Sequence, residues 1–165
     1  MTLLHPGPEQ EAWVAAQIEK HTLRDGPYKT SEGIQPVYLD AIAMLLAEPM
    51  FWRSYFEARI PFANGTDGER LWPVAQGSGG ATVLGLLGRG SLWQPFKDHG
   101  LPWNNLAPLI DRPPQLLDPR GRLCVVLVDD CRFTGATLNG LRTAVEALGC
   151  IVEAEVTAYR FQALP

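Results

Sequence analysis

The sequence has few cysteines and no excess of basic residues, and both absences limit what the chain can be. It contains 3 cysteines among 165 residues, without the paired spacing of a zinc site or a disulfide framework, so we expect a reduced, cytoplasmic setting. Its 14 lysines and arginines are outnumbered by 18 acids, and the net charge of −4 is spread along the chain. This balance disfavours nucleic acid or an anionic membrane surface as the main partner.

Long hydrophobic runs and two common phosphate-binding fingerprints are also absent. No apolar stretch is long enough to cross a membrane, and the first residues lack the pattern of a signal peptide, so we expect no membrane partner. Neither Gly-x-x-x-x-Gly-Lys-Ser/Thr nor Gly-x-Gly-x-x-Gly occurs. The length predicts a single domain over residues 1–165, and 46% hydrophobic residues are ordinary for a globular protein.

The most informative stretch is 123–137, where an apolar run is followed by two acids and a helical pattern. Residues 123–128 are rich in valine and too few for a helix, which predicts a strand buried on both faces of a parallel sheet. Residues 136–148 carry apolar side chains at helical spacing and end before Gly149. Ligands of open α/β sheets bind beyond the carboxyl ends of the strands, so we expect a site in the turn at 129–137.

The residue types in this turn suit a phosphorylated sugar. Thr134, Gly135 and Thr137 lie at the predicted helix N-terminus, where unpaired N–H groups, hydroxyls and the helix dipole can hold one phosphate. Asp129 and Asp130 would repel a phosphate, but they can bind sugar hydroxyls or a hydrated Mg²⁺. The alternative is a buried strand with an acidic helix N-cap, which explains Asp130 but neither the acid pair nor the threonines.

The pattern Val-Val-Leu-Val-Asp-Asp-x-x-x-Thr-Gly-x-Thr at 125–137 resembles the signature of the type I phosphoribosyltransferases, which bind phosphoribosyl pyrophosphate (PRPP) there. The resemblance implies an α/β fold with a parallel sheet, flanking helices and a small N-terminal hood, with the hood at about 1–60 and the core at about 68–165. It implies Mg²⁺ as cofactor, brought by PRPP, with Asp129 and Asp130 as candidate ligands. The implied phosphate-binding residues are Cys131, Arg132, Phe133, Thr134, Gly135, Ala136 and Thr137.

A second glycine-rich segment follows a predicted strand at 71–75 and precedes a predicted helix that ends at Leu87. A strand, a glycine-rich bend and a helix expose successive backbone N–H groups to an anion. In the family that the chain resembles, this loop binds pyrophosphate. The implied pyrophosphate-binding residues are Gln76, Gly77, Ser78, Gly79 and Gly80. The presence of the turn at 129–137 in the same chain strengthens this interpretation.

The hood region resembles one branch of the family, the orotate phosphoribosyltransferases. Leu23-Arg-Asp-Gly26 and Gln35-Pro-Val-Tyr-Leu-Asp40 are similar to the hood pattern of that branch, which implies that Arg24 and Tyr38 bind the base. Arg160, at the end of the last predicted strand (150–159), matches an arginine that contacts the carboxylate of the base. The alternatives are a solvated loop arginine, a core tyrosine and a strand-end arginine that faces water.

The stretch 89–121 is rich in proline and tryptophan and shows little periodicity, which predicts a long loop. Within it, Lys97-Asp-His-Gly100 resembles a loop of the orotate enzymes that reaches into the neighbouring subunit's site. This similarity implies a homodimer with Lys97 and His99 as catalytic residues beside the leaving pyrophosphate. Trp93 and Gln94 stand where the family usually has Arg-Lys, and a solvated turn remains the alternative.

The implied activity is transfer of the phosphoribosyl group of PRPP to a nitrogenous base, with orotate favoured, and release of pyrophosphate. Asp129 and Asp130 would act as catalytic residues that orient the ribose hydroxyls and stabilise positive charge on the ring, as in glycoside hydrolysis. Two alternatives stay open. One is a PRPP-binding sensor or regulatory module without turnover, and the other is a phosphoribosyltransferase for another base.

Overall fold

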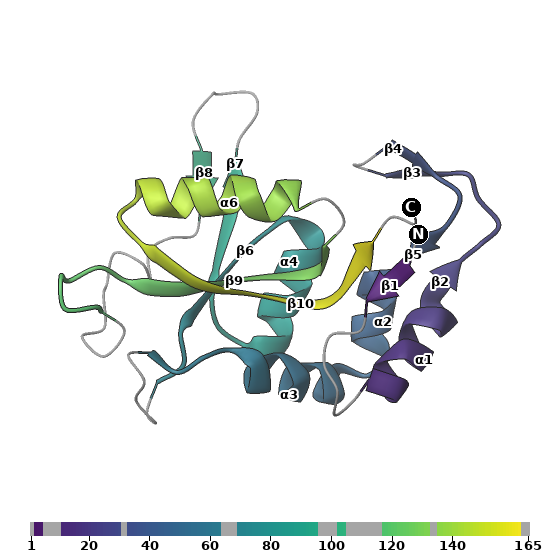
Figure 1. Cartoon of the computed structure of the whole chain (residues 1–165), viewed down its shortest axis with the longest axis horizontal. Helices are drawn as coiled ribbons and strands as arrows, with labels where there is room; N and C mark the ends of the chain where they lie inside the picture. The colour runs from purple at the N-terminus through teal and green to yellow at the C-terminus, as the bar shows by residue number, and fades with distance from the viewer. Residues whose placement is uncertain are drawn as a thin grey trace.

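The structure is a computed structural model, and it describes residues 2–4, 11–30, 33–63, 69–95, 102–104, 117–132 and 135–162. A six-stranded sheet of order β1-β10-β9-β6-β7-β8 forms its centre (Figure 1). The middle strands are parallel: β10 (Ile151–Gln162), β9 (Cys124–Arg132), β6 (Trp72–Gln76) and β7 (Ser91–Pro95). The edge strands are antiparallel to their neighbours: β1 (Thr2–Leu4) and β8 (Pro102–Asn104).

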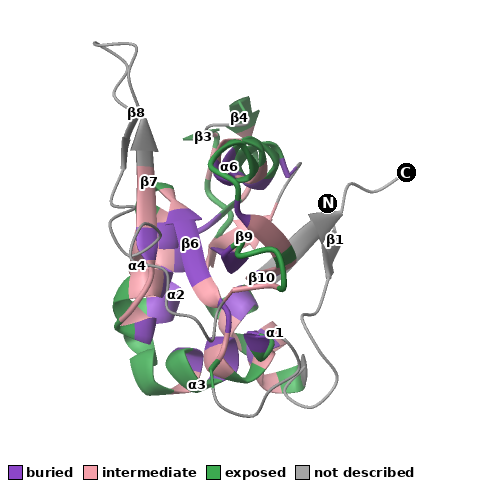
Figure 2. Ribbon diagram, turned by 90° about the vertical axis from the view of Figure 1, so that its left-hand side faces the viewer, coloured by how far each residue is buried: buried purple, intermediate pink, exposed green. Residues whose placement is uncertain are grey.

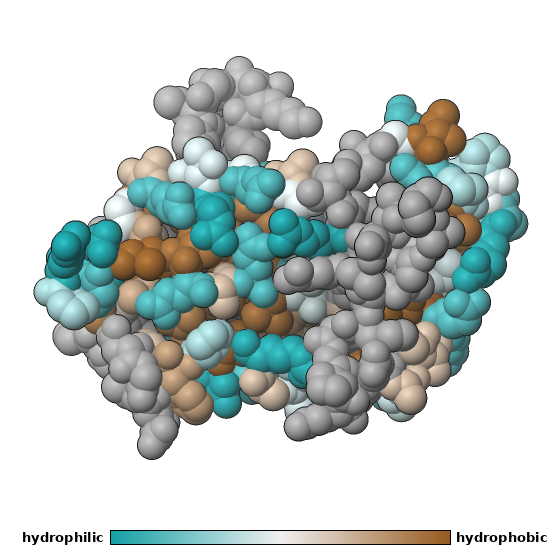
Figure 3. All heavy atoms as spheres, viewed as in Figure 1, coloured by the Kyte–Doolittle hydropathy of each residue, from teal (hydrophilic) through white to brown (hydrophobic). Residues whose placement is uncertain are grey.

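Helices cover both faces of this sheet, which confirms the expected α/β fold (Figures 1 and 2). On one face lies α6 (Ala136–Ala147), whose buried side chains Leu138, Leu141 and Val145 follow helical spacing. Its outer surface is hydrophilic (Figure 3). The other face is covered by α4 (Gly77–Leu87), with α2 (Ala41–Ala47) and α3 (Pro49–Arg59) packed beside it. Residues 123–128 are buried between these layers, as expected for a central parallel strand.

The two crossover helices leave the middle of the sheet in opposite directions. α4 connects β6 to β7, and α6 connects β9 to β10, while β6 and β9 are direct neighbours. Gly77 and Gly135, with φ of 78° and 85°, turn the chain sharply from each strand toward its helix. The carboxyl ends of β6 and β9 therefore border a topological switch point, where open α/β sheets bind their ligands.

A small hood lies beyond the end of the sheet that faces the N-terminus of α6 (Figure 1). It contains α1 (Glu11–His21) and two small antiparallel sheets, one of β2 (Thr22–Leu23) with β5 (Tyr38–Leu39) and one of β3 (Tyr28–Thr30) with β4 (Gly33–Gln35). Trp13 of α1 packs on Phe51 of α3, with ring centroids 3.8 Å apart. Asp40 caps α2 by accepting a hydrogen bond from the backbone N–H of Ala43. These contacts join the hood to the helices under the sheet.

Three elements differ from the expectation from sequence. β9 runs to Arg132 instead of ending before the acids, because β10 pairs with it along that length, opposite Asp129, Cys131 and Arg132. The glycine-rich segment forms the first turns of α4, not a separate loop. Within 89–121, where no regular structure was expected, β7 joins the sheet and pairs with β8.

None of the helices that the structure describes has the length and apolar character needed to cross a bilayer.

Candidate active site

A cavity of about 680 Å³ opens at the switch point between β6 and β9. Its first wall is the end of β6 and the start of α4, with Gln76, Gly77, Ser78 and Gly79. Its second wall is the end of β9, with Asp129, Asp130, Cys131 and Arg132. The start of α6 adds Gly135, Ala136, Thr137 and Leu138, and the hood adds Lys29, Tyr38 and Leu39.

The structure thus brings together two segments that lie some fifty residues apart in the sequence and that were assigned to phosphate groups. Gly80, the last residue of the predicted pyrophosphate segment, is buried behind this wall. A Cβ at Gly80 would come within 2.8 Å of the Cβ of Ala75, so this glycine allows α4 to pack closely on β6. Phe133 and Thr134 lie outside the described residues.

The acid pair is held in its place in the cavity wall by backbone hydrogen bonds. Asp129 Oδ1 accepts a hydrogen bond of 2.8 Å from the backbone N–H of Asp130. Asp130 Oδ1 accepts one of 2.7 Å from the backbone N–H of Cys131. The carboxylate of Asp130 lies directly on Gly79, so closely that a Cβ at that position would overlap its carboxylate atoms. Gly79 therefore lets the acid reach across from β9 to the start of α4.

Burial raises the pKa of Asp129 well above its usual range, and the charge of Asp130 raises that pKa further. Two adjacent carboxylates in one cavity are stabilised by a positive charge between or above them. In the described part of the chain, no group of three or more His, Cys, Asp or Glu side chains could hold a metal ion. The donor set at the cavity is two carboxylates, which fits Mg²⁺ because this ion is bound through one or two carboxylates with water and substrate phosphates.

The N-terminus of α6 borders the opposite side of the cavity. Gly135, Ala136 and Thr137 line it, so the positive end of the helix dipole faces the enclosed space. The N-cap is glycine, which has no side chain to accept hydrogen bonds from the first turn. Arg132, the last residue of β9, lies with its guanidinium beside Gly135: a Cβ at Gly135 would come within 2.8 Å of Nη2.

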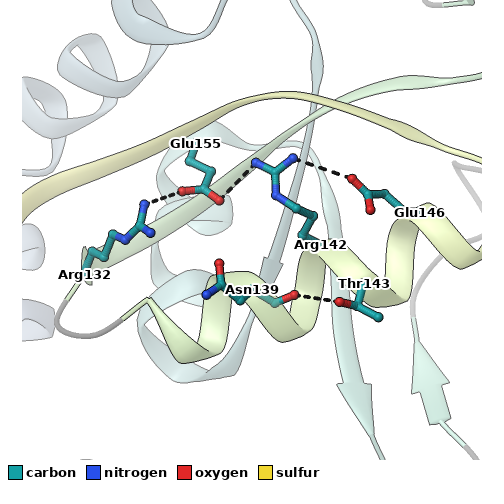
Figure 4. Close-up of polar contacts among 6 residues, drawn as sticks. All are labelled: Arg132, Asn139, Arg142, Thr143, Glu146 and Glu155. Atoms are coloured by element: carbon teal, nitrogen blue, oxygen red, sulfur yellow. Dashed lines mark hydrogen bonds and ion pairs between the residues drawn. The ribbon is translucent and has the colours of Figure 1, made fainter.

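Arg132 is held by a chain of ion pairs outside the cavity (Figure 4). Its Nη1 donates to Glu155 Oε2 of β10 at 2.7 Å. The other oxygen of that carboxylate accepts from Arg142 Nη2 of α6 at 3.1 Å. Arg142 in turn lies 3.6 Å from Glu146, one helical turn further along. These contacts connect the end of β9, the middle of β10 and the outer part of α6.

The hood closes the cavity with one cation and one aromatic ring. Tyr38 lines the same cavity as the acid pair. Burial raises the pKa of Tyr38, and the nearby charges of Asp40 and Asp130 raise it further. The rings of Tyr38 and Tyr28 are 5.8 Å apart. Lys29 reaches the cavity from β3 and was not identified from the sequence. No local pattern could have identified it, because its place depends on how the β3–β4 hairpin folds over the strand ends.

The structure does not place the other residues assigned from the sequence in this cavity. Arg24 is outside the lining of the cavity and pairs with Glu19 at 2.8 Å on the hood surface. The backbone of Arg160 pairs with Arg132 across β10 and β9, and its side chain is not described. Lys97 and His99 lie outside the described residues. Trp93 is part of β7 and packs against the core, and Gln94 follows it in the strand.

No protein-family model and no curated protein matches the sequence. Among solved structures, the fold is similar to the orotate phosphoribosyltransferase from Aeropyrum pernix, with a TM-score of 0.53 and 21% identity over 88% of this chain and 78% of that chain. It is also similar to UMP synthase from Leishmania donovani, with a TM-score of 0.51 and 14% identity over 91% of this chain and 31% of that chain. The chain therefore has the type I phosphoribosyltransferase fold, as its motif at 125–137 predicts.

Proposed function

We propose that the protein transfers the phosphoribosyl group of PRPP to a nitrogenous base, with orotate as the favoured base, and releases pyrophosphate. One observation carries the proposal. The start of α4, the acid pair of β9 and the start of α6 border one cavity at the switch point of the sheet, and the carboxylate of Asp130 lies directly on Gly79. Two helix N-termini on either side of two carboxylates suit a sugar with a phosphate group at each end.

The proposed roles follow from the charges along this cavity. The N-terminus of α6, with Gly135 and Thr137, would hold the 5′-phosphate, and the N-terminus of α4, with Gly77 and Ser78, would hold the pyrophosphate. The acids between them, which no phosphate would approach closely, would bind the ribose hydroxyls. As the bond to pyrophosphate breaks, positive charge develops on the ribose ring, and carboxylates placed beforehand stabilise it.

Mg²⁺ is the cofactor that this donor set fits, held by Asp129 and Asp130 together with oxygens of PRPP. When bound, it would neutralise charge that develops on the departing pyrophosphate. The chain itself would orient the sugar through the two carboxylates and keep the pyrophosphate close to the backbone N–H groups at the start of α4.

The base would lie on the hood side of the cavity, which supplies Lys29 and Tyr38. Orotate carries a carboxylate, which a lysine attracts, and a planar ring, which an aromatic face contacts well. Arg160 remains a proposed partner of that carboxylate. Arg24, bound to Glu19, would have to leave its ion pair to take part.

Incubation of the protein with PRPP, Mg²⁺ and single bases, with released pyrophosphate as the readout, tests the proposal. We expect release with orotate and none with adenine, and we expect Asp130→Asn to lower the rate at least about a hundredfold without unfolding the protein. Exposed Glu153→Gln on β10 is the matched control with the same loss of one charge. The proposal is wrong if no base in a panel of purines and pyrimidines gives release while PRPP remains intact.

A second candidate function is PRPP binding without turnover, as in a sensor or regulatory module. Trp93 favours it, because this residue occupies a place where the family usually has a cation, and its side chain packs against the core of the protein. A cation at this place would help to neutralise the leaving pyrophosphate. Binding of PRPP with micromolar affinity but without release for any base would support this second candidate.

We also propose that the protein is a homodimer in which Lys97 and His99 serve the site of the partner subunit. The proposal rests on the resemblance of Lys97-Asp-His-Gly100 to the loop of the orotate enzymes. Mixing Lys97→Ala chains with Asp129→Asn chains tests it, because a mixed dimer would carry one site with both residues intact. Recovery of activity on mixing is expected. If subunits demonstrably exchange and no activity returns, the loop does not act across the dimer.

A further inference from the structure

We infer that Arg132 is a fixed cation for the 5′-phosphate and that Glu155 and Arg142, which do not line the cavity, are positioning residues that hold it there. The inference rests on the proposed function, because the ligand is the phosphate group of a phosphoribosyl compound. It goes further in assigning a role to two residues outside the motif at 125–137 and outside the cavity.

The two edges of the Arg132 guanidinium have different neighbours. Nη1 points to Glu155 at 2.7 Å, whereas Nη2 and Nε lie beside Gly135, at 2.8 Å and 2.9 Å from where a Cβ would be. Gly135 is the N-cap of α6, so this edge of the guanidinium and the positive end of the helix are together. A planar fork held on one edge can offer its other N–H groups to a phosphate without searching for the right orientation.

Glu155 is the member of the network best shielded from water. Its side chain is 11% exposed, against 29% for Arg132 and 37% for Arg142. Each of its carboxylate oxygens accepts from a different arginine, so the carboxylate is fixed from both sides (Figure 4). The three side chains together carry one net positive charge, and Arg132 is the member that lines the cavity.

The ion pair between Glu155 and Arg132 allows two explanations to be separated: either Glu155 positions the guanidinium, or it acts only through its charge. Loss of the negative charge at Glu155 should tighten the binding of an anionic ligand if only charge matters. It should weaken binding if the carboxylate is needed to hold the guanidinium in place. Loss of the positive charge at Arg142 leaves Glu155 with one partner and should weaken binding in either case. The sign of the effect at Glu155 therefore decides between the two.

The experiment measures the dissociation constants of PRPP and pyrophosphate, each with Mg²⁺, for the wild type and single variants. Pyrophosphate is the internal reference, because its proposed site is at Gly77 and Ser78. We expect Arg132→Met to weaken PRPP binding by about ten- to a hundredfold. Glu155→Gln and Arg142→Gln should each weaken it by about three- to tenfold. Pyrophosphate affinity should change by less than about twofold in all three variants.

Two further variants keep the result clear. Arg132→Lys retains the charge but loses the fork, so it should bind PRPP nearly as weakly as Arg132→Met. Arg53→Gln, on the exposed surface of α3, removes one positive charge away from the cavity and should leave both affinities unchanged. Thermal unfolding of each variant shows whether the fold is intact. Tighter or unchanged PRPP binding by folded Glu155→Gln would overturn the inference, as would equal losses for PRPP and pyrophosphate.

Ribose 5-phosphate separates this inference from the proposed reaction. If the wild type releases no pyrophosphate from PRPP but binds ribose 5-phosphate, and the variants weaken that binding in the expected order, the inference stands and the proposed reaction falls. If the reaction occurs and the variants bind both phosphoribosyl ligands as the wild type does, the reaction stands and the inference falls. If the wild type binds neither ligand, both fall.

Discussion

The contact between Gly79 and Asp130 predicts a specific response to the smallest possible side chain. Gly79→Ala would place a methyl group inside the carboxylate of Asp130, which is itself fixed by the backbone N–H of Cys131. Either α4 shifts away from β9 or the carboxylate leaves its position. Overpacking of this kind destabilises proteins by about 1–3 kcal/mol. Displacement of the acid by about 1 Å would lower turnover by about a hundredfold.

Gly85→Ala is the matched control, because Gly85 lies in the same helix and an added Cβ meets nothing within 4 Å. Alanine is favoured over glycine inside a helix by about 1 kcal/mol, so this control should raise the unfolding temperature. The difference in unfolding free energy between the two variants cancels most of this helix effect. What remains is the cost of the overlap between the added methyl group and the carboxylate of Asp130. At about 2–4 °C per kcal/mol for a chain of this size, Gly79→Ala should unfold roughly 2–12 °C below Gly85→Ala.

The assay combines thermal unfolding with pyrophosphate release, and a double-mutant cycle locates the cause. In an Asp130→Ala background the carboxylate is gone, so Gly79→Ala should no longer destabilise the protein relative to Gly85→Ala. The coupling free energy between the two substitutions should equal the free-energy cost of the overlap, about 1–3 kcal/mol. Equal unfolding temperatures for the two alanine variants, together with unchanged turnover in Gly79→Ala, would refute the proposed contact and its role in the site.

Three further perturbations test other parts of the cavity. The raised pKa of Asp129 means that the folded protein holds this proton more tightly than the unfolded chain, so wild-type stability should fall as pH rises above about 4. Asp129→Asn should remove that fall in denaturant midpoints while abolishing turnover, and an unchanged pH profile would contradict this. Lys29→Met should weaken the inhibition of PRPP turnover by anionic pyrimidines and leave the inhibition by neutral bases unchanged. Equal weakening of the inhibition by anionic and neutral compounds would argue against a carboxylate partner for Lys29. Gly135→Val, at a φ of 85° and against the guanidinium of Arg132, should lower PRPP affinity at least about tenfold, while Gly140→Ala in open space on α6 should not.

Local patterns were sufficient to predict the helices that pack one face on the sheet. The apolar spacing at 136–148 corresponds to α6 (Ala136–Ala147), and the predicted helix that ends at Leu87 corresponds to α4 (Gly77–Leu87). The buried run at 123–128 predicted the central strand, and the cavity lies beyond the carboxyl end of that strand. In each case the pattern of apolar residues lies within a short segment of the chain. The spacing of apolar residues in such a segment indicates directly which side chains are buried.

The parts that were not predicted depend on partners distant in the sequence. Polar residues at the end of β9 continue the strand because β10 pairs with them, and neither the acids nor Arg132 favours a strand locally. The contact of Asp130 with Gly79, the approach of Lys29 from the hood and the ion pairs at Glu155 likewise join separate elements. A motif can indicate which residues meet a ligand, but it contains no information on the residues that support them from another strand.

The position of β10 between β9 and β1 affects how the chain folds during synthesis. β9 is made before β10, yet β10 covers one edge of β9 from Cys124 to Arg132. Until that pairing forms, the nascent protein exposes the edge of a strand with five consecutive buried apolar residues, and such edges pair readily with other chains. The strand that contains the acid pair is therefore prone to intermolecular pairing until β10 is made. Conditions that slow synthesis between the two strands should lower the yield of native protein, even though they alter no residue of the candidate active site.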